Sequence, residues 1–504
     1  MRSVHSAFKS FVSLGIACFA FGVLTSPAAA QITPGPPPTP PTAAQKQAQK
    51  SNMDLVGFND LQNRSAYQPL VEKQGQRWIA YIGHHGGTQL NPLTGQTEVN
   101  GTSIVDVTDP KQPKYLAHIP GQPTKSTSAD AGGAQMVRVC GGSELPHADK
   151  SKFYMLRTNG TESQEMWDVT DPSKPSRINT IVSGLLDTHK NWWECDTGIA
   201  YLVVGQPTWR VHRHLEIWDL SDPAKPVFIR DFGLPGQQPG SIGPQPSELH
   251  GPFSTGPKGN RVYLAYGQGN NGIIQILDRD KLLNGPKEPT EANLLYPQIA
   301  RVDFPKEAGA HTAFPVLGMD LAEFAKQRAV KPHDYLIVPG ETTGNECQEA
   351  MRQMVRILDI TEEARPIGVS TYTPTESTGN YCSDGGRFGA HSTNENMTPI
   401  YYKRIIFVAE FNAGVRAVDI RDPMHPKEIA YYVPAITDKT DKRCVGRGDQ
   451  QTCKIAIQTN NVDVDDRGYI YIVDRANTGM HILQLTGPAR QVANFSSMMS
   501  SAKP

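Results

Sequence analysis

The segment TSIVDVTDPKQPKYLAHIPG (residues 102–121) has the form of two strands joined by a tight turn. An apolar run leads to Asp106, Thr-Asp-Pro follows, and a second run begins after Pro113. An aspartate side chain accepts hydrogen bonds from backbone N–H groups two residues further on, and proline fixes φ in a turn. The segment therefore predicts a strand, a turn and a strand, with Asp106 bracing the turn.

Similar segments recur along the chain, which indicates a repeat architecture. The aspartate keeps its place in six segments, and these residues are Asp106, Asp168, Asp219, Asp278, Asp359 and Asp419. A seventh segment has Gln484 at this position. Another strand-like run precedes each segment, for example RVYLAY or YIYIVD, so that each unit contains roughly four strands. Seven such units around one axis predict an all-β fold, a seven-bladed β-propeller with four-stranded blades. An eight-unit count is also compatible with the sequence.

The repeated segments resemble the LVIVD repeats of exported bacterial propeller proteins. The resemblance extends over residues 55–490 and implies the propeller fold. The fourth and seventh units lack the full Asp-Pro signature, and the fifth contains a long insert. Because propellers host many functions, the resemblance implies no particular activity.

The N-terminus has the pattern of an export signal. Arg2 and Lys9 precede the apolar run FVSLGIACFAFGVL. The small residues of SPAAAQ then predict a cleavage site after Ala30. A membrane anchor is the alternative, but the run is shorter than the roughly 20 apolar residues of a spanning helix. We expect a signal peptide at 1–30, a disordered proline-rich tether at 31–53, the propeller at 54–490 and a C-terminal tail at 491–504.

The predicted compartment is the periplasm or the extracellular space, and the sequence contains no other candidate membrane span. The net charge of −1 gives no basic excess for nucleic acid. A small-molecule substrate or a protein of the cell envelope is therefore the expected partner.

Six cysteines remain after removal of the signal, an even number that favours disulfides in an oxidising compartment. Cys444 and Cys453 bracket a short polar loop and are the first expected pair. Cys347–Cys382 and Cys140–Cys195 follow by elimination, although six cysteines allow other connectivities.

Four of the 14 histidines occupy the same repeat position, at the start of the strand that would line the propeller axis. They are His189, His250, His311 and His391. The seventh unit has Asn460 or Asn461 there, and the second has a glycine or an alanine. Equivalent positions on innermost strands converge on the axis, so the four imidazoles are predicted to bind one transition metal ion, Fe or Cu, with Zn also suited. The alternative is that each histidine only hydrogen-bonds a loop carbonyl.

The ends of the second strands are expected near these histidines. Carboxylates there are predicted to orient the imidazoles by accepting their second N–H, and the candidates are Glu194, Glu341, Glu410 and Asp474. His84 and His85 lie at one such strand end and are the candidate catalytic acid and base. Trp192, Trp193 and Phe314 are candidates for an aromatic substrate pocket, with packing between blades as the alternative.

The proposed ligand arrangement is similar to that of carotenoid cleavage oxygenases, seven-bladed propellers that hold a non-haem Fe(II) on four axial histidines backed by glutamates. Methanethiol oxidases, which are similar to selenium-binding proteins, are propellers with a copper site. Along its length the chain looks like neither family, so the likeness concerns the ligands alone. It implies an oxidoreductase of the oxygenase or oxidase type that acts on a small organic molecule. An aromatic molecule is one candidate for this substrate. A non-catalytic binding or scaffolding propeller of the cell envelope is the alternative.

Overall fold

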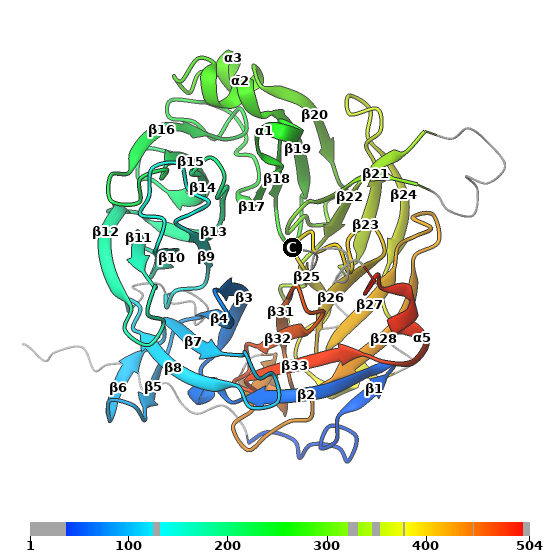
Figure 1. The fold of residues 1–504 in the computed structure, drawn as a ribbon. Coiled ribbons are helices and arrows are strands. Elements are labelled where there is room, and N and C mark those ends of the chain that lie inside the picture. The colour runs from blue at the N-terminus through cyan, green and yellow to red at the C-terminus, as the bar shows by residue number, and fades with distance from the viewer. Residues whose placement is uncertain are drawn as a thin grey trace, which may run out of the picture.

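The computed structural model of the protein describes residues 37–123, 132–320, 331–344, 353–375, 379–446 and 448–496. It is an all-β structure of mostly four-stranded antiparallel sheets that stand around a common centre (Figure 1). Within each of these sheets every strand pairs with the strand before it and the strand after it, as in a meander. The prediction of an all-β fold is confirmed.

Five separate sheets contain four strands each. The first three consist of β3 (Ala66–Gln74), β4 (Arg77–His84), β7 (Thr102–Asp106) and β8 (Lys114–Ile119); β9 (Val137–Gly141), β10 (Phe153–Asn159), β11 (Ser163–Asp168) and β12 (Ser176–Ser183); and β13 (Asp187–Trp193), β14 (Ile199–Gly205), β15 (His214–Asp219) and β16 (Val227–Phe232). The other two consist of β17 (Leu249–Ser254), β18 (Arg261–Tyr266), β19 (Ile273–Asp278) and β20 (Gln298–Asp303); and β21 (Phe314–Met319), β22 (His333–Pro339), β23 (Val355–Asp359) and β24 (Ile367–Tyr372).

Two further groups of strands share one larger sheet. They are β25 (Phe388–Thr393), β26 (Ile405–Phe411), β27 (Val415–Asp419) and β28 (Lys427–Val433) with β1 (Gln49–Ser51) at its edge, and β31 (Thr459–Val464), β32 (Ile470–Asp474), β33 (Met480–Leu485) and β2 (Met53–Asn59). The groups join at the pair Phe411–Thr459. Because β2 pairs with β33, strands from the two ends of the chain complete the last group.

The repeated aspartates end the third strand of their units and brace the turn that follows, as predicted. Asp106 Oδ1 accepts from the backbone N–H of Thr108 at 2.9 Å, and Asp219 Oδ1 accepts from that of Ser221 at 2.8 Å. Asp278 instead caps α2 (Arg279–Asn284) by accepting from the N–H of Lys281 at 3.0 Å. Five units thus use one local device to turn the chain toward the next element, and the sixth uses its aspartate as a helix cap.

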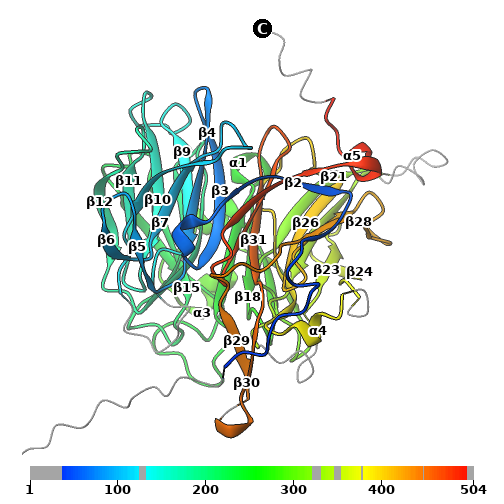
Figure 2. The ribbon, with the colours of Figure 1, turned by 90° about the horizontal axis from the view of Figure 1, so that it is seen from below.

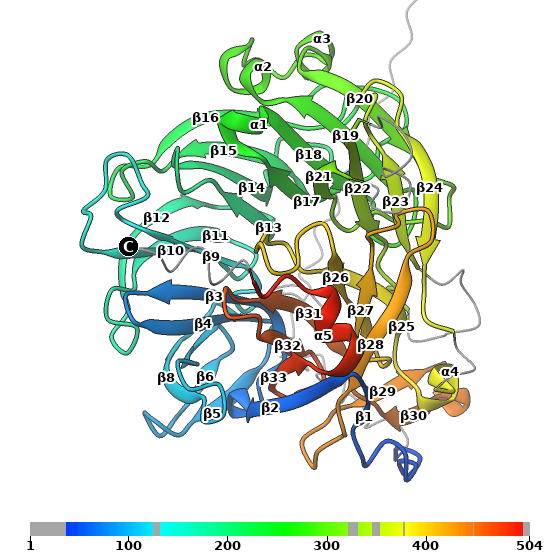
Figure 3. The same cartoon turned by 45° about the vertical axis from the view of Figure 1, so that its right-hand side comes forward.

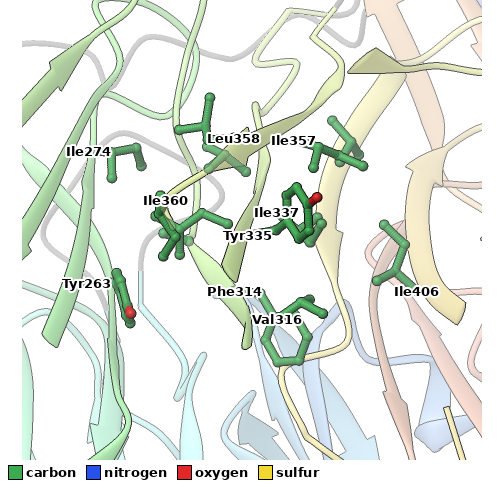
Figure 4. Close-up of a cluster of buried hydrophobic side chains, with 14 of the residues drawn as sticks. Tyr263, Ile274, Phe314, Val316, Tyr335, Ile337, Ile357, Leu358, Ile360 and Ile406 are labelled. Atoms are coloured by element: carbon green, nitrogen blue, oxygen red, sulfur yellow. The ribbon is translucent and has the colours of Figure 1, made fainter. Parts of the chain in front are cut away.

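Figure 1 shows β3, β9, β13, β17, β25 and β31 toward the centre, whereas β8, β12, β16, β20, β24, β28 and β2 lie outside. The strands between them carry long apolar runs because both of their faces pack against neighbouring sheets. One such cluster joins the sheet of β21–β24 to its two neighbours and includes Tyr263, Phe314, Tyr335, Ile357 and Ile406 (Figure 4). Each fully buried side chain of this size stabilises the fold by about 1.5–3 kcal/mol.

The described part of the predicted tether differs from the expectation of disorder. Thr39 donates its N–H to the carbonyl of Cys453 at 2.8 Å, and the Gln45 amide donates to the carbonyls of Asp384 and Ile455. β1 then pairs with β28 (Figure 3). Thr39, Gln45 and β1 therefore hydrogen-bond to backbone groups between Asp384 and Ile455, which the proline content of this segment does not predict. The signal peptide predicted at 1–30 lies outside the described residues.

Two predicted disulfides are present. Cys140–Cys195 joins the second sheet to the third, and Cys444–Cys453 closes the hairpin of β29 (Lys442–Val445) and β30 (Thr452–Ile455), which projects from one face (Figure 2). Cys382 is also disulfide-bonded, and its predicted partner Cys347 lies outside the described residues.

The remaining elements are short. They are β5 (Thr88–Asn91), β6 (Gln96–Val99), α1 (Gly256–Gly259), α3 (Glu291–Leu295), α4 (Tyr381–Asp384) and α5 (Gly487–Val492), the last of which ends just inside the predicted tail. In the described ranges, no helix has the length and apolar character needed to cross a bilayer.

Candidate metal centre

The four predicted histidines stand at the inner ends of neighbouring sheets. His189 lies in β13, His250 in β17 and His391 in β25, and His311 precedes β21. In β13, β17 and β25 the pairing register shifts at or around the histidine. A shift of this kind leaves a residue out of the ladder and re-aims its side chain.

The glycine of each Gly-Ala-His motif is required by close packing. A Cβ on Gly309 would lie 1.6 Å from the carbonyl oxygen of Gln268. Gly389 has a φ of +125°, and its Cβ would lie 2.5 Å from Thr342 Oγ1. The missing side chain lets the start of the inner strand approach the neighbouring unit, which brings the histidines together.

The imidazoles form a continuous row in the molecular interior. Ring centroids are 4.4 Å apart for His189 and His250, 4.1 Å for His250 and His311, and 4.5 Å for His311 and His391. All four side chains are buried, the most accessible being His189 at 6%. The structure therefore brings the four predicted residues together, each ring next to the following one.

Hydrogen bonds at Nδ1 fix the orientation and the tautomer of three imidazoles. His250 Nδ1 lies 2.9 Å from the carbonyl oxygen of His311, and His391 Nδ1 lies 2.5 Å from that of Asn460. Because a carbonyl only accepts, both Nδ1 atoms must carry the proton, and both Nε2 atoms present a lone pair. His189 Nδ1 lies 2.9 Å from Gln135 Oε1, in the same arrangement.

With the proton of His189 on Nδ1, the inward-facing nitrogen atom of His250 has no hydrogen-bond donor opposite it. His189 Nε2 lies 2.8 Å from His250 Nε2. Among the described residues, neither ring nitrogen of His311 has a hydrogen-bond partner. Buried polar atoms are normally satisfied, so this cluster of acceptors indicates a place for a cation.

Glu341 lies beside the same nitrogen atoms. Its carboxylate oxygens are 3.7 Å from His250 Nε2 and 3.7 Å from His391 Nε2. Ligand atoms of His250, His311 and Glu341 all lie within 4.8 Å of one another, a spacing that a metal ion can bridge. The sequence predicted that Glu341 orients a histidine from behind through the outer N–H; the structure instead places it on the inner side, as a candidate ligand.

Burial keeps the imidazoles neutral. It is the largest cause that lowers the pKa of all four histidines well below the usual range, and for His189 and His250 the charge of Arg213 is the next cause. Neutral imidazole is the form that binds transition metals.

Sequence comparison of the units missed two residues of this layer. Tyr67 in β3 lies with its hydroxyl 3.1 Å from His189 Nε2, and its ring centroid is 5.9 Å from that of His391. Gln135 fills the corresponding position of the second unit. The signal was the preceding alanine, since Ala66-Tyr67 and Ala134-Gln135 match the Ala-His pairs of the fifth and sixth units.

A second layer of charged side chains lies next to the histidines. Lys190 of β13 forms an ion pair with Glu395, which follows β25, and Arg138 Nη2 of β9 lies 2.6 Å from Glu395 Oε2. All three are at least 91% buried, and Arg138 also donates to the carbonyl of Asn191 at 3.0 Å. We call Lys190, Glu395 and Arg138 the ion triad.

Three of the predicted carboxylates lie in other clusters. Glu194 accepts from Arg279 at 2.8 and 2.6 Å, at the end of β13 opposite His189. Asp474 accepts from the backbone N–H groups of Gln458, Ala476 and Thr478 and so braces a loop. Glu410 acts on Tyr372, whose pKa is raised first by burial and then by this carboxylate.

The two candidate catalytic histidines differ in placement. His84 Nε2 lies 2.7 Å from Ser103 Oγ, inside the first sheet. The ring centroid of His85 lies 5.1 Å from that of Tyr67, and His85 lines a cavity above the histidine row. The structure therefore leaves His85, rather than His84, in a position to contact a bound molecule.

The candidate aromatic residues pack between sheets, which is the alternative stated for them. The rings of Trp192 and Phe253 are 4.0 Å apart, and those of Phe253 and Phe314 are 5.6 Å apart. Trp193 is 95% buried in another core cluster. They belong to the hydrophobic core.

Another potential ligand group consists of His214, Glu216 and Asp231 in the third sheet. Glu216 accepts from Trp218 Nε1 at 2.9 Å, and Glu165 of the second sheet accepts from Trp167 Nε1 at 2.8 Å in the same way. This recurrence indicates a packing network of the repeat.

Comparison with known proteins does not assign the chain to a family: no family model matches it, and no curated protein matches its sequence.

Proposed function

We propose that the seven groups of four strands are the blades of a seven-bladed β-propeller. The radial arrangement in Figure 1, the turn aspartates at the same strand end and the pairing of β2 with β33 support this architecture. Radial repetition closed by strands from both chain ends leaves few exposed sheet edges. The repeats remain similar to LVIVD units.

The second part of the proposal is that the chain is an exported metalloprotein. The disulfides Cys140–Cys195 and Cys444–Cys453 fit an oxidising compartment, either the periplasm or the extracellular space. One transition metal ion, Fe or Cu, would be held by His189, His250, His311 and His391 together with Glu341.

One observation carries the metal proposal. His189 and His250 both face an acceptor with Nδ1, and their Nε2 atoms lie 2.8 Å apart. Lone pairs at this distance repel, whereas a cation between them is attracted to both. The rival arrangement is a metal-free one, in which His189 carries its proton on Nε2 and donates it to His250.

We propose that the activity is that of an oxidoreductase of the oxygenase or oxidase type on a small organic molecule. Bound Fe or Cu supplies Lewis-acid and one-electron chemistry. Glu341 contributes one negative charge to the site, and the Tyr67 hydroxyl and His85 imidazole face the cavity, where they can hold a proton beside a substrate.

The test is elemental analysis of the protein purified after export. We expect about one Fe or Cu per chain, lost in the His311→Ala/His391→Ala variant. The matched control is His333→Ala/His425→Ala, because these histidines are bonded to Asp359 and Asp422 away from the row. At a free metal concentration of 100 times Kd, the metal should stabilise the wild type by about 2.7 kcal/mol.

A native protein without metal, whose Tm does not change when Fe or Cu is added, would contradict the proposal. It would favour the binding or scaffolding propeller. Loss of metal from the control variant as well would show that the four histidines do not determine binding.

A further inference from the structure

The cavity above the histidine row has the size and position of a substrate site. Its volume is about 580 Å³, within the range of about 300–1,000 Å³ of small-molecule pockets. Tyr67, His189 and Glu341 line it and also belong to the candidate metal centre. A molecule in this cavity would therefore lie directly against the proposed ion.

Three guanidinium groups line the cavity, each from a different group of four strands. They belong to Arg213 before β15, Arg387 before β25 and Arg475 after β32. The described lining also contains three carboxylates, those of Glu162, Asp187 and Glu341. The cationic and anionic side chains therefore balance before a metal is counted, and a divalent ion makes the site net positive.

From this balance we infer that the substrate is a small organic carboxylate, whose negative charge offsets the ion and whose carboxylate is bound by Arg213 and Arg475. The inference deepens the proposed function, since it rests on the charge of the proposed ion. Arginine matches a carboxylate in geometry because its planar guanidinium presents parallel N–H donors.

Arg213 is held in place for such a role. Its Nε donates to Asp187 Oδ2 at 2.7 Å and its Nη1 to Gln268 Oε1 at 3.4 Å. A guanidinium has five N–H donors, so these two bonds orient the group and leave a further edge to meet a ligand. A preorganised cation of this kind binds an anion without first losing side-chain freedom.

One wall of the cavity is apolar. Leu185 and Leu186 line it, and Leu186 is 51% exposed although it is a large aliphatic residue. On the other side of the histidine row, the ion triad fills the space between β9, β13 and the end of β25. The ligand therefore enters from the side of the arginines, with an apolar body against the leucines.

The experiment compares small carboxylates with neutral isosteres by isothermal titration calorimetry on the full exported chain. The probes are acetate, benzoate and phenylacetate, each paired with its amide. We expect at least one acid to bind at least about tenfold more tightly than its amide, the scale of one charge-assisted hydrogen bond. Arg213→Gln and Arg475→Gln should each remove this preference without changing the metal content.

Arg421→Gln is the matched control, because Arg421 is bonded to Asp419 on an exposed turn. It should leave the preference intact. Equal binding of every acid and its amide would overturn the inference, as would a preference that survives in both Arg213→Gln and Arg475→Gln. Metal content measured on the same samples separates the two proposals: metal without acid preference ends this inference alone, and acid preference without metal ends the proposed function alone.

Discussion

The histidine row and the ion triad meet in β13 and at β25, yet their polar atoms are satisfied in opposite ways. His189 and Lys190 are consecutive residues of β13. Lys190 meets a carboxylate that a second cation also contacts, so both cations of the triad have an anionic partner within the protein. His189 instead presents Nε2 to another nitrogen atom.

This difference separates a structural polar layer from the candidate metal centre. The triad connects three sheets across the centre, and each of its charged groups has an oppositely charged partner, although its net charge is +1. The row exposes acceptors to acceptors, which only a cation or an altered tautomer resolves. Position on the axis alone therefore does not mark a functional residue.

The largest loss of stability is expected when the anion of the triad is removed. Glu395→Gln leaves Lys190 and Arg138 buried without their shared anion, so the variant should lose about 3–5 kcal/mol of stability, measured by urea unfolding. The control is Glu363→Ala, which removes the partner of Arg261 from an ion pair that is more exposed than the triad. It should cost at most about 1 kcal/mol. An equally small cost for Glu395→Gln would show that water reaches the triad.

Acid should weaken the triad in a defined range of pH. Burial alone would raise the pKa of Glu395, but Lys190 and Arg138 outweigh it and hold the pKa below the usual value. The ion pair thus contributes stability above about pH 4.5, and this contribution is lost as pH falls through the folded-state pKa, by up to about 1.4 kcal/mol per pH unit.

The measurement is the stability gap between wild type and Glu395→Gln at pH 5 and pH 3. Both proteins keep the four histidines, so the difference in stability between them reports the contribution of Glu395 alone. We expect it to shrink as pH falls. A constant gap would mean that the stability lost in the variant has a cause other than the charge of Glu395.

The sequence predicted the members of the row that are the same residue type at the same repeat position. His189, His250, His311 and His391 were found for this reason, whereas Tyr67 differs in type and was missed. The ion triad was out of reach for another reason: Lys190 and Glu395 are 205 residues apart and do not occupy equivalent positions.

Glu341 and Glu410 show why the sequence does not settle which carboxylate at a strand end reaches the histidines. Glu341 follows β22 by two residues and reaches the histidines, while Glu410 lies inside β26. Its neighbour Phe411 contacts His391, with ring centroids 5.0 Å apart. Glu410 instead acts on Tyr372 of β24, so a difference of one or two residues at the strand end decides which carboxylate reaches the histidines.

The smallest expected effect tests whether a metal and Tyr67 compete for His189. The Tyr67 hydroxyl lies 3.1 Å from His189 Nε2, and a lone pair that binds an ion cannot also accept this hydrogen bond. In metal-free protein, Tyr67→Phe should therefore cost about 0.5–1.5 kcal/mol, the usual value of one hydrogen bond. With metal bound the cost should fall toward zero, so the metal should stabilise the variant more than the wild type. If Tyr67→Phe instead weakens metal binding, the phenol is itself a ligand; if the cost is the same with and without metal, His189 Nε2 does not bind the ion.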